Sequence, residues 1–316
     1  MSLLGIDLGG TKLALALFRN DAGIISKETV AISRKQGRDV GRLICEKASE
    51  KVKEASKHGD AVKSVGVSVP GIYHSSTGKV WAPNIPGWDD YPLLDEMKAA
   101  LNETHVSIDS DRACYISGEF WQGNARGCSN AIFLAVGTGI GAGIMINGEI
   151  LRGQNDIAGA IGWMALSGSY DASYDECGCF ESFASGEGIA KQARRLLIEK
   201  GTIKSVLREI PFEKLTAVDV FSAFSSGDTI AQEVIGTAVR YWGMASANLV
   251  SLFNPEKIIF GGGVFGPAIS LLQNIKNEAR KWAQPVSITQ VSFEATALGG
   301  DAGVVGAGYL AMKNLV

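Results

Sequence analysis

Two glycine-rich turns stand out among the residues that could do chemistry. The first covers residues 7–12 and reads DLGGTK, and the second covers residues 137–141 and reads GTGIG. Backbone N–H groups with no Cβ beside them can approach phosphate oxygens closely, and nearby threonine or lysine side chains can add donors. A tight structural hairpin would explain either turn equally well. Taken singly, each turn leaves phosphate binding and plain structure both open.

The second turn also fits the spacing of a dinucleotide-binding fingerprint, through Gly137, Gly139 and Ala142. That fingerprint requires a helix after the turn, because the pyrophosphate lies on the helix N-terminus. Here an apolar segment follows and closes at Asn147-Gly148, which is a hairpin signal. The pattern therefore argues against NAD binding.

Asp111 is a candidate for acid–base work. It follows a predicted strand at 105–109, and a helix is predicted from about Arg112 onward. A carboxylate in this position could accept the proton of an attacking hydroxyl, a role that contributes about 10²–10⁴-fold in rate. The alternative is that Asp111, Ser110 or Asp109 is an ordinary helix N-cap.

The two glycine turns lie between segments of strand character. Apolar runs at 3–7 and 13–18 flank the first turn, and runs at 131–136 and 142–146 flank the second. Two strand–turn–strand units about 130 residues apart suggest an internally duplicated fold. Further strands are predicted at 25–32, 62–68 and 257–260, and helices at 37–57, 92–101, 181–200, 216–253 and 302–315.

The composition excludes several classes of protein. The 316 residues include 30 basic and 33 acidic side chains, which leave no electrostatic footprint for nucleic acid or an anionic membrane. The apolar stretch 131–146 is Gly-rich and shorter than the ~20 residues of a membrane-spanning helix. Five scattered cysteines and the lack of a signal peptide point to a reducing compartment. We therefore expect a cytoplasmic protein.

Taken together, the motifs are much more specific than either turn alone. In chain order they are DLGGTK at 7–12, Ser110-Asp111, GTGIG at 137–141, PEKIIFGGG at 255–263 and LGGDAG at 298–303. This set resembles the actin/hexokinase-like phosphotransferases and, more narrowly, the ROK family of sugar kinases and their repressor relatives. The repressors carry a helix-turn-helix module ahead of the first hairpin, and only four residues precede Gly5 here. We therefore expect an enzyme rather than a regulator.

The resemblance implies an α/β fold of two ribonuclease-H-like domains around a cleft. The first domain would cover 1–115 plus 300–316 and hold the first phosphate hairpin and a sugar loop. The second, covering 116–299, would hold the second phosphate hairpin and an adenosine loop. The resemblance also implies that this chain forms a homodimer or homotetramer.

The resemblance further implies an ATP- and Mg²⁺-dependent sugar kinase in which Asp111 is the catalytic base. Asp7 would orient the Mg²⁺–phosphate unit. The other expected nucleotide contacts are Gly9, Gly10, Thr11, Lys12, Gly137, Thr138, Gly139, Gly262 and Gly263. The expected acceptor contacts are Gly71, Asn84, Ser110, Asp111, Trp163 and Glu181.

The acceptor motif departs from the family pattern at two positions. Family glucokinases carry a Glu and a His that bind sugar hydroxyls, where this chain has Ala160 and Trp163. Polar groups built to pair with hydroxyls discriminate strongly, and Trp163 offers a flat apolar face with one donor instead. We therefore expect a hexose or hexose derivative rather than glucose alone. An amino or acylated sugar, a cyclitol, or a homologue that binds nucleotide or sugar without catalysis are the alternatives.

The same segment lacks the family's zinc motif. The expected His is Trp163, and of the cysteine ligands only Cys177 and Cys179 remain, out of the required spacing. The histidines of the chain, His58, His74 and His105, lie in other predicted elements. We therefore predict no structural zinc and assign no metal ligand.

Overall fold

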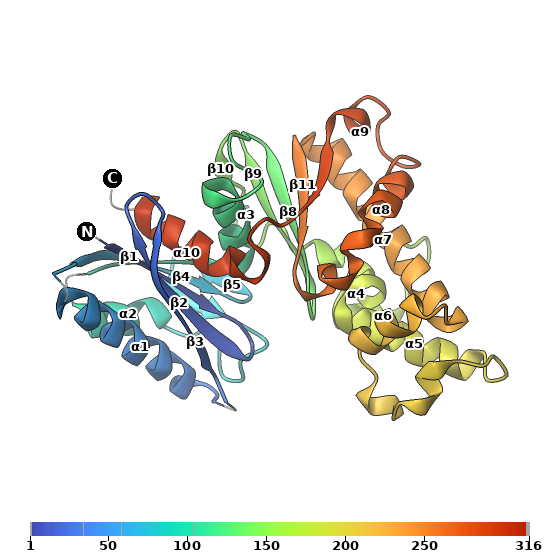
Figure 1. Ribbon diagram of the computed structural model, residues 1–316, viewed down its shortest axis with the longest axis horizontal. Helices are drawn as coiled ribbons and strands as arrows, with labels where there is room; N and C mark the ends of the chain where they lie inside the picture. Colours follow the sequence, from blue (N-terminus) through green and yellow to red (C-terminus); the bar gives the residue numbers. More distant parts are fainter. Residues whose placement is uncertain (1, 34, 58, 103, 314–316) are drawn as a thin grey trace. The chain divides into compact units, whose positions relative to one another are not determined.

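The computed structural model describes residues 2–33, 35–57, 59–102 and 104–313 (Figure 1). The chain forms two compact units, each of which is described by itself. The first comprises Met1–Gly127, Ile150–Ala158 and Thr296–Val316, and the second comprises Cys128–Glu149 and Gly159–Ala295. Among the described residues, no helix combines the length and the apolar character needed to cross a membrane.

The first unit is built on a five-stranded sheet in the order β3-β2-β1-β4-β7. The strands are β1 (Ser2–Leu8), β2 (Lys12–Arg19), β3 (Ile24–Ala31), β4 (Val62–Val69) and β7 (His105–Ser110). Strand β1 runs antiparallel to β2 and parallel to β4, which in turn runs parallel to β7. A two-stranded sheet, β5 (Ile72–His74) and β6 (Lys79–Trp81), follows β4.

The second unit repeats this arrangement, with the order β10-β9-β8-β11-β12. Its strands are β8 (Ala131–Val136), β9 (Ile140–Ile146), β10 (Glu149–Ile150), β11 (Lys257–Gly261) and β12 (Ser292–Ala295). Strand β8 pairs antiparallel with β9 and parallel with β11, as β1 pairs with β2 and β4. The predicted internal duplication is confirmed at the level of sheet topology.

Helices cover both sheets. The first unit contains α1 (Arg38–Lys57), α2 (Leu93–Leu101), α3 (Asp111–Gln122) and α10 (Ala302–Lys313). The second contains α4 (Cys179–Ala184), α5 (Gly186–Glu199), α6 (Ala217–Ser225), α7 (Thr229–Phe253), α8 (Leu272–Ala279) and α9 (Ser287–Gln290).

Two predicted helices are each divided in two. The predicted helix 181–200 breaks at Ser185, whose extended backbone ends α4 and whose side chain caps α5 by accepting a hydrogen bond from the Gly188 N–H. The predicted helix 216–253 breaks before Asp228, which caps α7, because Gly227 has a positive φ of 84°. The predicted capping box of Thr216 and Asp219 is present at the start of α6. Residues 314–316, at the end of the predicted closing helix, lie outside the described part of the chain.

The boundaries of the two units also differ from the predicted domain boundaries at 115/116 and 299/300. Helix α3 belongs to the first unit because it packs directly against α10. Gly118 and Gly306 allow this approach: a Cβ on Gly306 would lie 1.8 Å from the Cys114 carbonyl oxygen. Segment 150–158 also joins the first unit, although its neighbours in the chain belong to the second.

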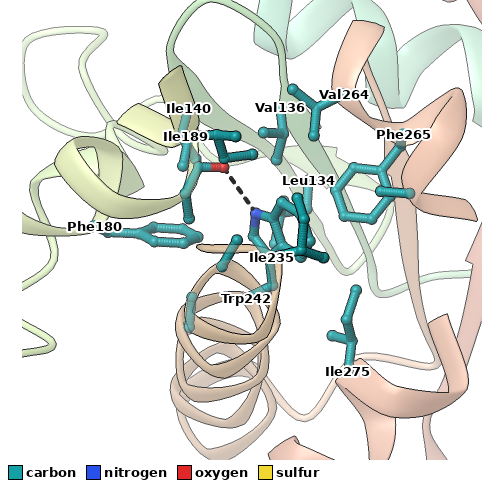
Figure 2. Packing of buried hydrophobic residues seen from close by; sticks show 14 of the residues in the cluster. Leu134, Val136, Ile140, Phe180, Ile189, Ile235, Trp242, Val264, Phe265 and Ile275 are labelled. Carbon is teal, nitrogen blue, oxygen red and sulfur yellow. Dashed lines mark hydrogen bonds between the residues drawn. The ribbon is translucent and has the colours of Figure 1, made fainter. Parts of the chain in front are cut away.

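The core of the second unit lies between its sheet and α7. Trp242 of α7 is fully buried, and its indole N–H donates a 3.0 Å hydrogen bond to the Ala184 carbonyl (Figure 2). Leu134 of the sheet and Phe265 surround the ring, with ring centroids of Trp242 and Phe265 5.1 Å apart. The indole thus satisfies its one polar atom at the end of α4 and fixes α4 to the core.

Candidate functional site

Asp7 lies near the end of β1, next to Ser68 on the parallel strand β4. The Ser68 hydroxyl donates a 2.6 Å hydrogen bond to Asp7 Oδ1. Gly303 packs against the same carboxylate, because a Cβ on this glycine would lie 2.5 Å from the carboxyl atoms. Burial raises the pKa of Asp7, while the Ser68 hydrogen bond and the charge of Lys12 oppose the rise. The carboxylate is thus oriented from two sides.

Asp111 begins α3, directly after β7, at the same edge of the sheet. Ser110 is the N-cap of α3, and its side chain accepts a hydrogen bond from the Ala113 N–H. The cap alternative therefore applies to Ser110 and leaves the Asp111 carboxylate for another role. Asp111 Oδ1 accepts from the Arg112 N–H at 2.7 Å, and the Tyr115 hydroxyl donates to Oδ2 at 3.5 Å.

The surroundings of Asp111 make it a stronger base than an ordinary aspartate. Burial raises its pKa from 3.8 to about 6, and the negative charge of Asp7 acts in the same direction. The positive charge of Arg112 opposes the shift. A carboxyl group with this pKa is ionised at neutral pH and still has useful affinity for a proton. Asp7 and Asp111 thus form a pair of carboxylates at one sheet edge.

The structure adds polar contacts in the first unit that the sequence did not predict. Buried Asp109 forms an ion pair with Arg152 and accepts a 2.8 Å hydrogen bond from the Ser110 N–H. Asp156, which has a positive φ of 61°, accepts hydrogen bonds of 2.9 Å from both the N–H and the hydroxyl of Ser75. Arg152 and Asp156 both lie in segment 150–158, so their partners are set by tertiary structure rather than by a local pattern.

The first glycine turn forms the predicted hairpin between β1 and β2. The Gly9 N–H donates a 2.9 Å hydrogen bond to the Lys12 carbonyl. Gly10, Thr11 and Lys12 are exposed, and a Cβ on Gly10 would meet no atom within 4 Å. The turn therefore presents open backbone and two donor side chains at the edge where Asp7 lies.

The predicted acceptor loop is anchored by its apolar residues. Trp88 is buried, donates a 2.9 Å hydrogen bond to the Gly37 carbonyl and stacks on Tyr91. Asn84 is left exposed within this loop. Gly71 has a φ of 84°, and a Cβ there would lie 2.2 Å from the Trp81 carbonyl oxygen, so only glycine fits.

In the second unit, the glycine turn at 137–141 is again a hairpin, here between β8 and β9. The Gly137 N–H donates to the Gly139 carbonyl at 2.9 Å, and the Gly186 N–H donates to the Gly137 carbonyl at 2.8 Å. Thr138 is exposed at the tip. A strand rather than a helix follows the turn, as predicted, so the dinucleotide fingerprint is excluded.

Glu181 of α4 lies against this second hairpin. Its Oε2 accepts a 2.6 Å hydrogen bond from the Ile140 N–H. Gly139 and Gly162 leave room for it, because a Cβ on either would lie less than 3.0 Å from its Oε2. Burial raises the pKa of Glu181, and the Ile140 hydrogen bond opposes the rise.

The predicted adenosine loop follows β11, beside the same hairpin. Strand β11 is parallel to β8 with Gly261 opposite Ala135. Gly262 has a φ of 92°, and a Cβ there would lie 2.3 Å from the Val136 carbonyl oxygen. A Cβ on Gly263 would meet no atom within 4 Å. The second unit therefore brings its predicted nucleotide residues to one sheet edge.

Trp163 and Ala160 occupy a short 3₁₀ turn of the second unit. The Trp163 residue is 58% exposed, and Ala160 is partly buried. Cys179 is buried at the start of α4, and the Cys177 sulfur lies 3.3 Å from the Ser182 hydroxyl. Within the described part of the chain, no group of three or more His, Cys, Asp or Glu is placed to hold a metal ion. His58 lies outside those residues, and the absence of zinc stays a prediction.

The predicted site residues are divided between the two units. Gly71, Asn84, Ser110 and Asp111 lie in the first unit with the hairpin at 7–12. Trp163 and Glu181 lie in the second with the hairpin at 137–141 and the loop at 262–263.

Known proteins resemble this chain over nearly its whole length. The ROK family model matches residues 3–314. A glucokinase of Halalkalibacterium halodurans is 34% identical over 97% of this chain and 94% of its own length. A xylose repressor of Caldicellulosiruptor bescii is 28% identical over 94% of this chain and 76% of its own length. A ROK family glucokinase from Streptomyces griseus, solved with glucose and AMPPNP, is 28% identical with a TM-score of 0.80, over 99% of this chain and all of its own.

Proposed function

Because this chain belongs to the ROK family, we propose that it is an ATP-dependent sugar kinase. It transfers the γ-phosphoryl group to a hydroxyl of a hexose or hexose derivative. The observation that carries the proposal is Asp111, a carboxylate that is not the helix cap and whose pKa is raised to about 6. The related glucokinases and the structure holding glucose and AMPPNP support the same conclusion.

Asp111 is the base of the proposed reaction. It accepts the proton of the acceptor hydroxyl as that oxygen forms a bond to the γ-phosphorus of ATP. The bond from this phosphorus to the bridging oxygen breaks at the same time, which gives ADP and a sugar phosphate. The raised pKa suits this role, because a base whose pKa lies near the working pH transfers protons most effectively.

The nucleotide would be bound by the two hairpins and the loop after β11. Gly10, Gly137 and Gly263 support this assignment, because a Cβ at each would point into open space that a phosphate or ribose could occupy. Thr11 and Thr138 are exposed on the hairpins and would add hydroxyl donors. The remaining proposed contacts are Gly9, Lys12, Gly139 and Gly262.

Asp7 would orient the Mg²⁺–phosphate unit, as the resemblance to the family implies. Mg²⁺ bound to phosphates usually keeps several water ligands, and the oriented carboxylate of Asp7 could accept hydrogen bonds from them. When bound, the ion supplies charge neutralisation for the phosphates. It would also offset the burial that disfavours the ionised form of Asp7.

The acceptor would contact Gly71, Asn84, Ser110, Trp163 and Glu181. The open face of Trp163 favours an acceptor with an apolar surface or substituent, so the proposed substrates include amino or acylated sugars and cyclitols beside glucose. By resemblance to the family we also propose a homodimer or homotetramer. The five unpaired cysteines are consistent with the cytoplasm as its compartment.

The decisive experiment is ADP release from Mg-ATP with a panel of hexoses, amino and N-acyl sugars, ketoses and cyclitols. We expect the wild type to turn over at least one acceptor. The exposed control Asp89→Asn should do the same, and Asp111→Ala should not. Turnover that survives in Asp111→Ala would contradict the role of the base. No turnover across the panel, with ATP still bound, would favour a homologue that binds without catalysis.

A further inference from the structure

The side chain of Arg112 links helix α3 to two other segments of the first unit. Its Nη2 donates a 3.2 Å hydrogen bond to the Gly71 carbonyl, in the predicted acceptor loop after β4. Its Nη1 makes a longer contact of 3.5 Å with the Ile157 carbonyl, in segment 150–158. Its own backbone N–H donates to Asp111 Oδ1 at 2.7 Å. One residue therefore contacts the proposed base, the acceptor loop and the inserted segment.

These contacts use the planar fork of a guanidinium. Two N–H groups of one rigid group are directed to two carbonyl oxygens, which fixes the distance between the loop and the segment. The Gly71 backbone is itself constrained, because its positive φ and close packing under Trp81 admit no side chain. Because the backbone at Gly71 cannot easily adjust, we expect a shift of the Arg112 side chain to move the whole loop relative to Asp111.

Arg112 is also the principal positive charge acting on Asp111. Partial burial lowers the Arg112 pKa, whereas the charges of Asp111 and Asp109 raise it. A partly buried cation is screened less by salt and water than an exposed one. The other nearby guanidinium, that of Arg152, is paired with Asp109.

We propose that Arg112 is a positioning residue for phosphoryl transfer, which holds the Gly71 loop beside Asp111 and places its positive charge next to that carboxylate. The inference rests on the proposed function, because it takes Asp111 as the base. The side chain acts through Asp111 and Gly71 and has no assigned contact with either substrate.

The charged and titratable groups around Asp111 come from several elements. They are Asp7 on β1, Asp109 on β7, and Arg112, Cys114 and Tyr115 on α3, with Lys12 on β2 and Asp301 acting on Asp7. Ser68 on β4 is a hydrogen-bond donor to Asp7. Removing Arg112 leaves mainly negative and neutral groups beside Asp111, so the carboxylate becomes harder to ionise.

Two substitutions separate the charge from the geometry. Arg112→Met removes both, and Arg112→Lys keeps a positive charge without the fork that reaches Gly71 and Ile157. For each variant, kcat and the acceptor KM are measured from pH 5 to 9 with the best acceptor found for the wild type. Arg126→Met, an exposed arginine in the same unit, is the control for the same loss of net charge.

The wild type should lose activity as the pH falls through about 6, because protonated Asp111 cannot accept the hydroxyl proton. Arg112→Met should move this acid limb of kcat upward by about one pH unit or more. Arg112→Lys should leave the limb in place and raise the acceptor KM about tenfold. The control should match the wild type in both quantities.

An unchanged pH profile and KM in both Arg112 variants would overturn the inference while the kinase assignment stands. A wild type without turnover, or an active Asp111→Ala, would instead overturn the proposed function. If Arg112→Met does not fold, Arg112→Lys still decides: a KM equal to that of the wild type rejects the positioning role.

Discussion

A carboxylate that serves as a base must be ionised, and at Asp111 ionisation is opposed by the surrounding protein. The folded protein raises the pKa of this group to about 6, whereas its ordinary value is 3.8. Above pH 6 the charge is therefore present in a place that disfavours it. Below about pH 3 the group is protonated in both the folded and the unfolded chain, so it has no effect on stability.

The variant Asp111→Asn should therefore be more stable than the wild type at pH 7.5, by about 1–3 kcal/mol. This advantage should shrink as the pH falls below 6 and vanish near pH 3. Urea unfolding at several pH values measures it, with exposed Asp89→Asn as the control for a lost negative charge. A variant no more stable than the wild type at pH 7.5 would show that burial does not penalise this carboxylate.

The proposed effect of Trp163 on substrate preference can be tested directly. The double variant Trp163→His and Ala160→Glu restores the polar groups of the family pattern, and should shift relative rates toward glucose by about tenfold or more. The measurement is kcat/KM for glucose and for the best acceptor. Trp282→His is a matched control, because Trp282 is 59% exposed in the same unit. Unchanged relative rates would remove Ala160 and Trp163 from the acceptor site.

At the scale of elements, α10 is placed by residues that lack side chains. Gly5 on β1 and Gly66 on β4 face this helix, and a Cβ on Gly66 would lie 1.9 Å from the Ala307 carbonyl oxygen. Gly306 and Gly118 form the equivalent close contact between α10 and α3. The backbone of α10 therefore packs directly on both the sheet and the helix that begins with Asp111.

Gly306→Ala should destabilise the protein by about 1–3 kcal/mol, because the added methyl group overlaps Cys114 in a closely packed contact. The same substitution at Gly236, an exposed position of α7 with no atom within 4 Å of the added Cβ, should instead stabilise by about 0.5–1 kcal/mol. Shifts in the urea midpoint of opposite sign are the expected readout. A neutral Gly306→Ala would mean that α10 can move away from α3.

Local patterns and long-range contacts differ in how far the sequence predicts them. Both glycine hairpins and the central strands could be predicted, because turn glycines and apolar runs are local signals. The breaks at Ser185 and Asp228 were missed although short turn signals, Ser185-Gly186 and Ser226-Gly227-Asp228, mark both of them. Asp111 could be predicted through its motif, whereas the contact from Arg112 to Gly71 joins residues 41 apart in the chain and follows only from the fold.

At the scale of the whole molecule, the two units repeat one sheet topology and share the proposed work. Each contributes one phosphate hairpin, and each contributes residues proposed to contact the acceptor. The proposed contacts of each substrate therefore come from both units. Binding of one substrate should organise the residues that receive the other.

We expect AMPPNP to bind more tightly when the best acceptor is present, by about 5- to 150-fold. Isothermal titration of AMPPNP with and without saturating acceptor measures this factor. The reverse titration is an internal control, because coupling between two ligands must be equal in both directions. Equal AMPPNP affinities in the two titrations would argue that the substrates do not depend on shared residues of the two units.

The chain passes between the units at 127/128, 149/150, 158/159 and 295/296, and this order has a consequence for biosynthesis. Strands β1, β2 and β3 leave the ribosome before the second unit is made, whereas α10, the helix that covers β1 and β4, leaves after it. The second unit is continuous from residue 159 to 295 and is completed earlier. During translation we therefore expect the glycine-lined face of the first sheet to stay uncovered until α10 emerges, which leaves it open to misassembly in that interval.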